Sequence, residues 1–168
     1  ISVSCFVPKP FTAFQWEGQD TLEELVDKQN HLRDCVRGEK HIRYNWHEAK
    51  VSRIEAVFAR GDRKLSRALL EAHRMGLKFD GWDEFFDYDK WLEAFRLAGV
   101  DPAFYANRDF GLDEVLPWDV IDCGVTKEFF RREREKAYCS KTTPNCREHC
   151  SGCGANRLGG ERTCCPHQ

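Results

Sequence analysis

The sequence has no hydrophobic run that approaches the roughly 20 residues needed to cross a lipid bilayer. It also lacks a basic start followed by an apolar stretch and a small-residue cleavage site, which is the pattern of a secretory signal peptide. These absences disfavour the membrane and secreted classes of protein. We therefore expect a cytoplasmic protein without a membrane partner.

A strong charge of either sign is absent as well. The chain of 168 residues has 26 Lys and Arg residues against 28 Asp and Glu residues, a formal net charge of -2. Nucleic-acid-binding domains usually carry an excess of positive charge, so composition leaves a nucleic-acid partner unproven. The sequence contains no nucleophile elbow, phosphate-binding glycine loop or zincin motif. We predict no catalytic residue in this chain.

Apolar periodicity predicts an α+β fold that is mostly α-helical, with one or two short strands. Residues 1–7 alternate as a buried strand does, and the prolines of PKPF then stop any sheet. A second short strand is expected over residues 42–46. From Asp20 onward the apolar spacing becomes helical, with Asp20 as the N-cap and Glu23 as its partner in a capping box.

Several further helices are expected. Two apolar faces separated by the turn at residues 60–62 predict a helical hairpin, and turn chemistry accounts for the letters RGD without an adhesion role. The aromatic segment that ends at Gly99 is expected to lie mainly in the core. Asp101 begins a short helix, and Thr126 caps KEFFRREREKAY, whose mixed charges predict local ion pairs on a solvated face.

The nine cysteines are unevenly distributed. Cys5 and Cys35 are isolated, whereas the other seven crowd the last third of the chain. An odd number of cysteines in a chain long enough to build a core is unlike a secreted disulfide scaffold. In CREHCSGCGAN, Cys146, Cys150 and Cys153 are separated by three and then two residues. Thiolates at such short intervals are the usual ligands of a soft metal or an iron–sulfur cluster.

A closed metal site needs a fourth ligand. The candidates are Cys123, Cys139, His149, Cys164, Cys165 and His167. We choose Cys165, because it precedes a proline as ferredoxin ligands often do. Gly152 and Gly154 would allow the backbone to turn closely and present amides to sulfur. An iron–sulfur cluster, zinc and the absence of any metal stay open here, since sulfur ligands suit both metals.

A series of segments resembles, in order, the C-terminal part of the cobalamin-binding-domain family of radical S-adenosylmethionine proteins. The resemblance spans nearly the whole chain. The segments are SVSCFVPKPFTAFQWEGQ, IRYNWHEA, EAVFARGDRKL, FDGWDEFF, WLEAF, DPAFYANR, LPWDVIDCGV and TTPNCREHCSGCGAN.

The resemblance implies that this chain, which begins at Ile1 without a methionine, is part of a longer radical enzyme. Residues 1–16 would be the last strand and exit loop of a partial β/α barrel, residues 17–138 a helical extension, and residues 139–168 a cysteine-rich metal-binding tail. The partners would be the missing N-terminal cobalamin-binding and barrel domains. Those domains would carry the [4Fe–4S] cluster that cleaves S-adenosylmethionine, and a role for cobalamin stays open.

The family's catalytic cysteine loop follows the first barrel strand, whereas CREHCSGCGAN follows a helix near the C-terminus. The resemblance therefore implies a second, auxiliary iron–sulfur cluster at Cys146, Cys150, Cys153 and Cys165. Lys9, in the exit loop, is the candidate cofactor-binding residue, with a solvated loop lysine as the alternative. A competing hypothesis is a non-enzymatic zinc-binding interaction module for RNA or protein, built from the helix around Arg131 and the cysteine tail.

Overall fold

The computed structural model describes residues 1–159, and the chain forms two compact units. Unit 1 contains residues 1–8 and 17–109, and unit 2 contains residues 9–16 and the chain from Phe110 onward. This spatial division differs from the sequence-based segments 1–16, 17–138 and 139–168. Those segments concern the place of the chain in a larger protein and stay a prediction.

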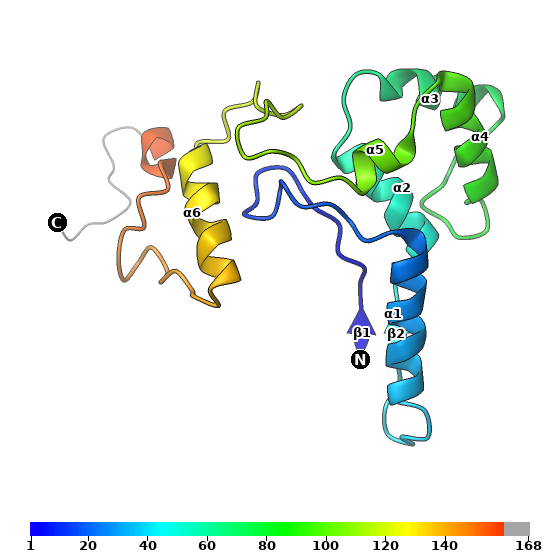
Figure 1. The fold of residues 1–168 in the computed structure, drawn as a ribbon, viewed down its shortest axis with the longest axis horizontal. Coiled ribbons are helices and arrows are strands. Elements are labelled where there is room, and N and C mark those ends of the chain that lie inside the picture. Colours follow the sequence, from blue (N-terminus) through cyan, green and yellow to red (C-terminus); the bar gives the residue numbers. More distant parts are fainter. Residues whose placement is uncertain (160–168) are drawn as a thin grey trace. The chain divides into compact units, whose positions relative to one another are not determined.

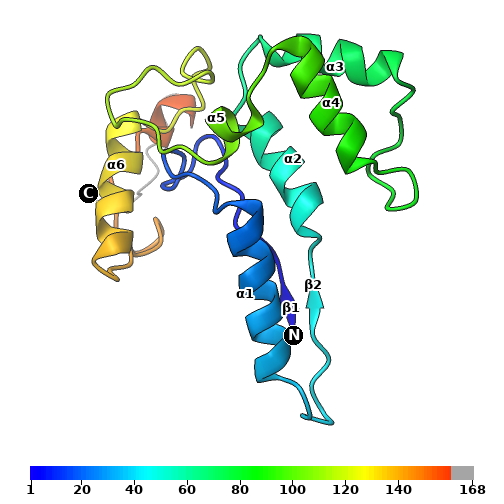
Figure 2. The ribbon, with the colours of Figure 1, turned by 45° about the vertical axis from the view of Figure 1, so that its right-hand side comes forward.

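Unit 1 combines one pair of strands with five helices (Figure 1). Ser2 lies opposite Asn45 and Val3 opposite Trp46 in a parallel ladder, and Figure 2 shows the first helix alongside this strand pair. The expected mostly helical α+β class is confirmed. The elements are β1 (Ser2–Val3), α1 (Leu22–Cys35), β2 (Asn45–Trp46), α2 (Ala49–Ala59), α3 (Leu65–Arg74), α4 (Tyr88–Ala98) and α5 (Pro102–Ala106).

Both strands are shorter than the sequence predicts. Residues 1–7 and 42–46 each contribute only two residues to the ladder. The second strand is followed at once by α2, which begins at Ala49, so the pairing has little room to extend. Alternation of side chains cannot reveal this limit, because it reports burial rather than the presence of a neighbouring strand.

The core of unit 1 lies between α2, α3, α4 and α5. Small alanines allow the helices to approach closely, while Trp91 and Phe95 of α4 fill the space against Phe58 of α2. The buried members of this core are Ile54, Ala56, Val57, Leu65, Ala68, Ala72, Leu77, Trp91, Ala94, Phe95, Tyr105 and Ala106.

A buried arginine fixes the end of α5. The Arg60 side chain is fully buried, and its Nη1 donates to the carbonyl oxygens of Tyr105 and Ala106 at 2.5 and 2.9 Å. Its Nη2 donates to the carbonyl oxygen of Arg108 at 2.6 Å. Burying a guanidinium is unfavourable unless it is hydrogen-bonded, and the free carbonyls at a helix C-terminus are suitable acceptors. Arg60 thereby joins the end of α2 to the end of α5.

The predicted N-cap of the first helix is wrong by one residue. Thr21 is the N-cap, and Glu24 completes the capping box: the Thr21 amide donates to Glu24 Oε2 at 2.8 Å and the Glu24 amide donates to Thr21 Oγ1 at 3.3 Å. Asp20 instead pairs with Lys28 at 2.5 Å. Asp20 with Glu23 and Thr21 with Glu24 both satisfy the sequence pattern of a capping box, and the backbone selects the second pair.

The helical hairpin predicted at residues 60–62 is present, with Arg60 as the C-cap of α2 and Lys64 as the N-cap of α3. Helix α2 ends at Ala59 and α3 begins at Leu65. Asp62 Oδ1 accepts a hydrogen bond from the Lys64 amide at 2.8 Å. Close packing favours glycine at position 61, because a Cβ there would lie 2.0 Å from Leu65 Cδ1 and 2.9 Å from the Val57 carbonyl oxygen. The RGD letters therefore have a structural explanation.

The expectation that the aromatic segment lies mainly in the core is only half correct. Trp91 and Phe95 are buried, but Phe79, Trp82 and Phe85 are 63%, 64% and 54% exposed. These three precede α4 in a loop, where no helix periodicity directs them to one face. The local contact of Phe79 with Phe85, with ring centroids 5.9 Å apart, does not cover either ring.

Unit 2 contains one α-helix, α6 (Lys127–Tyr138), and a short 3₁₀ helix, η1 (Ala155–Gly159), within the described residues. Its core consists of Trp16, Phe110, Leu116 and Trp118, against which Phe11 and Phe130 pack. None of the helices within residues 1–159 has both the length and the apolarity that a membrane crossing requires.

Candidate metal centre

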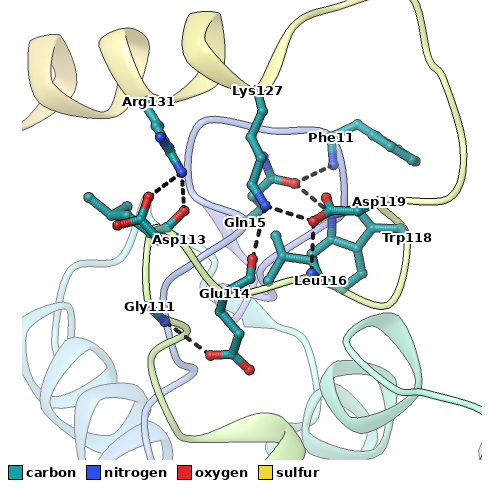
Figure 3. A network of polar contacts seen from close by, with 11 residues as sticks. Phe11, Gln15, Gly111, Asp113, Glu114, Leu116, Trp118, Asp119, Lys127 and Arg131 are labelled. Carbon is teal, nitrogen blue, oxygen red and sulfur yellow. Dashed lines mark hydrogen bonds and ion pairs between the residues drawn. The ribbon is translucent and has the colours of Figure 1, made fainter.

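The loop that precedes α6 is fastened by a buried glutamine in unit 2. Gln15 Oε1 accepts hydrogen bonds from the Trp118 indole Nε1 at 2.6 Å and from the Phe11 amide at 3.2 Å (Figure 3). Both Gln15 and Trp118 are buried. One side-chain oxygen therefore satisfies two donors and joins the segment of residues 9–16 to the loop around Trp118.

Two cations of α6 bind this same loop (Figure 3). Lys127 Nζ donates to Asp119 Oδ2 at 2.7 Å and to the Glu114 carbonyl oxygen at 2.9 Å. Arg131 Nη2 donates to Asp113 Oδ1 at 2.8 Å. The predicted N-cap Thr126 is confirmed, since its Oγ1 accepts from the Phe129 amide. The first turns of α6 are therefore held to the preceding loop by several polar contacts.

The cysteine segment packs on these first turns of α6. The Thr126 amide donates to the Cys153 carbonyl oxygen at 2.9 Å, and Arg132 Nη2 donates to the Ser151 and Gly152 carbonyl oxygens, both at 3.3 Å. Gly154 faces the same turn so closely that a Cβ would lie 2.8 Å from Thr126 Cγ2. The segment after Cys150 is thus attached to the N-terminal turns of α6.

The backbone on both sides of Cys153 turns sharply, and one of its amides donates to the Cys153 sulfur. Gly152 and Gly154 have φ values of +66° and +96°, a left-handed conformation that favours glycine, and the Ala155 amide donates to Cys153 Sγ at 3.5 Å. Amides that donate to sulfur stabilise the thiolate and tune a metal bound to it. Both glycines turn the backbone at Cys153, while the amide that donates to sulfur is that of Ala155; their predicted role at a metal stays a prediction.

Cys123 belongs to the turn against which Cys153 packs. Its Sγ donates to the Val125 carbonyl oxygen at 3.6 Å, and Thr126 follows three residues later. The Leu158 side chain lies on the next residue, Gly124, since a Cβ there would lie 2.3 Å from Leu158 Cδ1. Cys123, one of the six possible fourth ligands named from the sequence, is therefore on the segment adjoining Cys153.

Two other predicted ligands, Cys146 and Cys150, lie in the described residues. Cys146 is exposed, whereas Cys150 and Cys153 are partly buried. Cys165 lies outside the described residues. Within residues 1–159, no three or more His, Cys, Asp or Glu side chains are grouped so that they could hold a metal ion. The donor types and the local fold at Cys153 suit a metal, but the described residues do not by themselves form the site.

Lys9, the predicted cofactor-binding residue, lies in an exposed loop of unit 2. The Thr12 hydroxyl donates to the Lys9 carbonyl oxygen at 2.8 Å. The assignment of Lys9 stays a prediction.

The charges of α6 are largely paired. Besides Lys127 and Arg131, Lys136 binds Glu133 at 2.9 Å, and hydrogen bonds from Thr143 and Lys136 lower the pKa of Glu133. The expected local ion pairs are thus confirmed. Because carboxylates already neutralise three of its five cations, α6 offers less positive charge to a phosphate backbone than its basic residues suggest.

No protein-family model, curated protein or solved structure matches this chain. The resemblance to radical S-adenosylmethionine proteins therefore stays a prediction from the sequence segments.

Proposed function

We propose that this chain is the C-terminal segment of a radical S-adenosylmethionine enzyme and that residues 139–168 hold an auxiliary iron–sulfur cluster. The observation that carries the metal proposal is the hydrogen bond from the Ala155 amide to Cys153 Sγ, set between two left-handed glycines. Around a thiolate ligand this turn supplies both curvature and a donor to sulfur.

The ligand set would form on metal binding. Cys153 is already fastened to the start of α6, and a metal would draw Cys146, Cys150 and Cys165 toward it. Metal binding commonly supplies the free energy that orders its own ligands, so an ungathered set is compatible with this proposal. Cys123 is the alternative fourth ligand, because its turn adjoins Cys153.

The proposal for the first residues rests on the exposed edge of β1. Within residues 1–159 the sheet has only two strands, so one edge of β1 has no strand partner, and Ile1 and Phe6 are 63% and 47% exposed. Parallel pairing with β2 is the arrangement that a β/α barrel would continue. Residues 1–16 would complete such a barrel, with Lys9 at its mouth. S-adenosylmethionine and, where used, cobalamin would bind the missing domains.

The test is metal analysis of the 168-residue chain purified without oxygen. Iron, sulfide and zinc are measured, together with the visible absorption spectrum, for the wild type and a Cys146→Ala/Cys150→Ala/Cys153→Ala variant. Cys35→Ala is the matched control, because Cys35 is an exposed cysteine on α1 in unit 1.

We expect iron and sulfide in the wild type and in Cys35→Ala, and their loss from the triple variant. If zinc is found in the wild type and in Cys35→Ala and is lost from the triple variant, the result would favour the alternative, a non-enzymatic zinc-binding interaction module. A protein partner would then be favoured over RNA, because three of the five cations of α6 are paired with carboxylates. Equal metal content in the triple variant, or no metal in any protein, would overturn the metal site.

A further inference from the structure

Unit 1 contains a cavity of about 680 Å³ between α3, α5 and the turn that joins α4 to α5. Arg63, Lys64 and Arg67 line the side formed by the start of α3. Phe104 and Tyr105 of α5 line another side. Cavities of roughly 300–1,000 Å³ are the usual size of small-molecule sites.

The three cations of this cavity have no ion pair within residues 1–159, although cations elsewhere in unit 1 do. Arg74 at the other end of α3 binds Glu71 at 2.7 Å, and Arg96 of α4 binds Glu93 at 2.6 Å. Asp101 is the one acidic residue in the lining, and its Oδ1 already accepts a hydrogen bond from the Ala103 amide. The cavity therefore has an excess of positive charge.

Helix stability does not explain these cations. The N-terminal end of a helix carries partial positive charge, so acidic residues are favourable there and basic residues unfavourable. Helices α1, α4 and α6 follow this rule, with acidic residues in their first turns, whereas α2 has no acidic residue there and has Lys50. In α3 the first turn has no acidic residue, and Arg67 lies within it beside Arg63 and Lys64. A local rule broken without a structural gain is typical of a functional surface.

The walls of the cavity are held in place by buried contacts. Tyr105 is 5% exposed, and its hydroxyl donates to Asp62 Oδ1 at 3.0 Å. Arg60 binds the carbonyl oxygens of Tyr105, Ala106 and Arg108. A cavity fixed in this way needs little rearrangement to bind a ligand, which favours affinity.

We propose that this cavity binds a small molecule that carries phosphate groups. Arg63, Lys64 and Arg67 would pair with the phosphate oxygens, since guanidinium and ammonium groups form charge-assisted hydrogen bonds with them. Phe104 is 49% exposed and offers an apolar surface for the organic part of the molecule. Its ring is oriented by the Arg108 guanidinium, 4.4 Å from the ring centroid.

The test is isothermal titration calorimetry of the 168-residue chain at low ionic strength, with pyrophosphate, ATP and adenosine as probes. The variant is Arg63→Gln/Arg67→Gln, and the control is Arg74→Gln/Arg96→Gln, which removes two exposed, ion-paired arginines of α3 and α4. Circular dichroism checks that each variant keeps its helices. Phe104→Ala tests the apolar wall.

We expect pyrophosphate and ATP to bind the wild type and the control, and to bind the Arg63→Gln/Arg67→Gln variant at least about tenfold more weakly. Binding should weaken as salt is added, and adenosine alone should not bind. If ATP binds the wild type more tightly than pyrophosphate does and this difference is lost in Phe104→Ala, the site recognises an organic phosphate. If both probes bind equally, the site recognises the phosphate groups alone. Absence of binding by both phosphates, or equal loss in the control, would overturn the proposal.

Discussion

Tyr105 donates its hydroxyl hydrogen to Asp62 Oδ1 at 3.0 Å and so joins α5 to the turn between α2 and α3. The same carboxylate oxygen accepts a hydrogen bond from the Lys64 amide at 2.8 Å. One oxygen therefore holds both the start of α3 and the side chain of α5. Burial, and after it the hydrogen bond to Asp62, raises the pKa of Tyr105 to about 12.

This pKa predicts how stability depends on pH. Between about pH 10 and pH 12 the unfolded chain loses the Tyr105 proton while the folded chain keeps it, so the free energy of unfolding falls as pH rises through this range. Tyr105→Phe keeps the ring and removes this contribution. Urea unfolding from about pH 8 to about pH 12 should therefore show a shallower decline for Tyr105→Phe than for the wild type. Parallel declines would contradict the prediction.

Replacement of Arg60 should destabilise unit 1 strongly. Arg60→Leu fills part of the volume but removes a donor from the carbonyl oxygens of Tyr105, Ala106 and Arg108, of which Ala106 keeps its hydrogen bond from the Gln19 amide at 2.8 Å. Each buried group that is left unsatisfied costs about 1–3 kcal/mol. We expect a loss of at least about 3 kcal/mol, measured by urea unfolding. Arg74→Leu, at an exposed ion pair, should change stability by less than about 1 kcal/mol.

The sequence predicts the helices of this protein well where the signal is local. Thr126, Asp101 and the glycine after α4 are the caps expected, and Gly99 has the left-handed φ of +66° that ends a helix. Cap and turn preferences involve neighbouring residues only, so one sequence is enough to recognise them. Where two local patterns overlap, as at Asp20 and Thr21, the tertiary contacts decide.

Features that depend on distant residues are not visible in the sequence. The binding of Arg60 to carbonyls 45 and more residues away has no local signal, and neither has the exposure of Trp82. The metal site falls between these cases. Spacing identifies Cys146, Cys150 and Cys153 as one group, but the attachment of Cys153 to Thr126 is a tertiary contact that only the structure provides.

The capping box should discriminate between two adjacent glutamates. Glu24→Ala removes the acceptor of the Thr21 amide and should lower the free energy of unfolding by about 0.5–2 kcal/mol. Glu23→Ala, one residue earlier on the same turn, is the control and should have a smaller effect. Chemical denaturation of both variants measures the difference. A larger decrease in the free energy of unfolding for Glu23→Ala would instead support Asp20 as the N-cap, as the sequence pattern predicts.

Gly18 should tolerate no side chain. A Cβ at Gly18 would lie 2.2 Å from the Asn107 carbonyl oxygen, which is backbone and cannot rotate away. The Gly18 amide also donates to Asp109 Oδ1 at 2.7 Å, and separation of the two segments would lengthen that bond. We expect Gly18→Ala to reduce stability by about 1–3 kcal/mol. Gly81→Ala is the control, because a Cβ there has no heavy atom within 4 Å.

Alanine substitutions at the two glycines that flank Cys153 distinguish the effect of backbone strain from the effect of packing on the proposed metal centre. Alanine at either position adopts a left-handed conformation that costs about 1–2 kcal/mol. At Gly152 the new Cβ meets only the flexible Arg132 side chain, at 3.8 Å, whereas at Gly154 it lies 2.8 Å from Thr126 Cγ2 and 3.3 Å from the Gly124 carbonyl oxygen. Only Gly154→Ala should therefore push Cys153 away from the start of α6.

If that attachment positions the thiolate, Gly154→Ala should release its metal to a chelator faster than Gly152→Ala, and Gly152→Ala faster than the wild type. The measurement is the time course of metal release from the purified chain after addition of excess chelator. Equal rates for the two variants would mean that strain alone matters and that the Cys153–Thr126 contact does not organise the metal centre. The order of the release rates thus tests whether the Cys153–Thr126 contact positions the thiolate, whereas metal analysis tests whether a metal is bound at all.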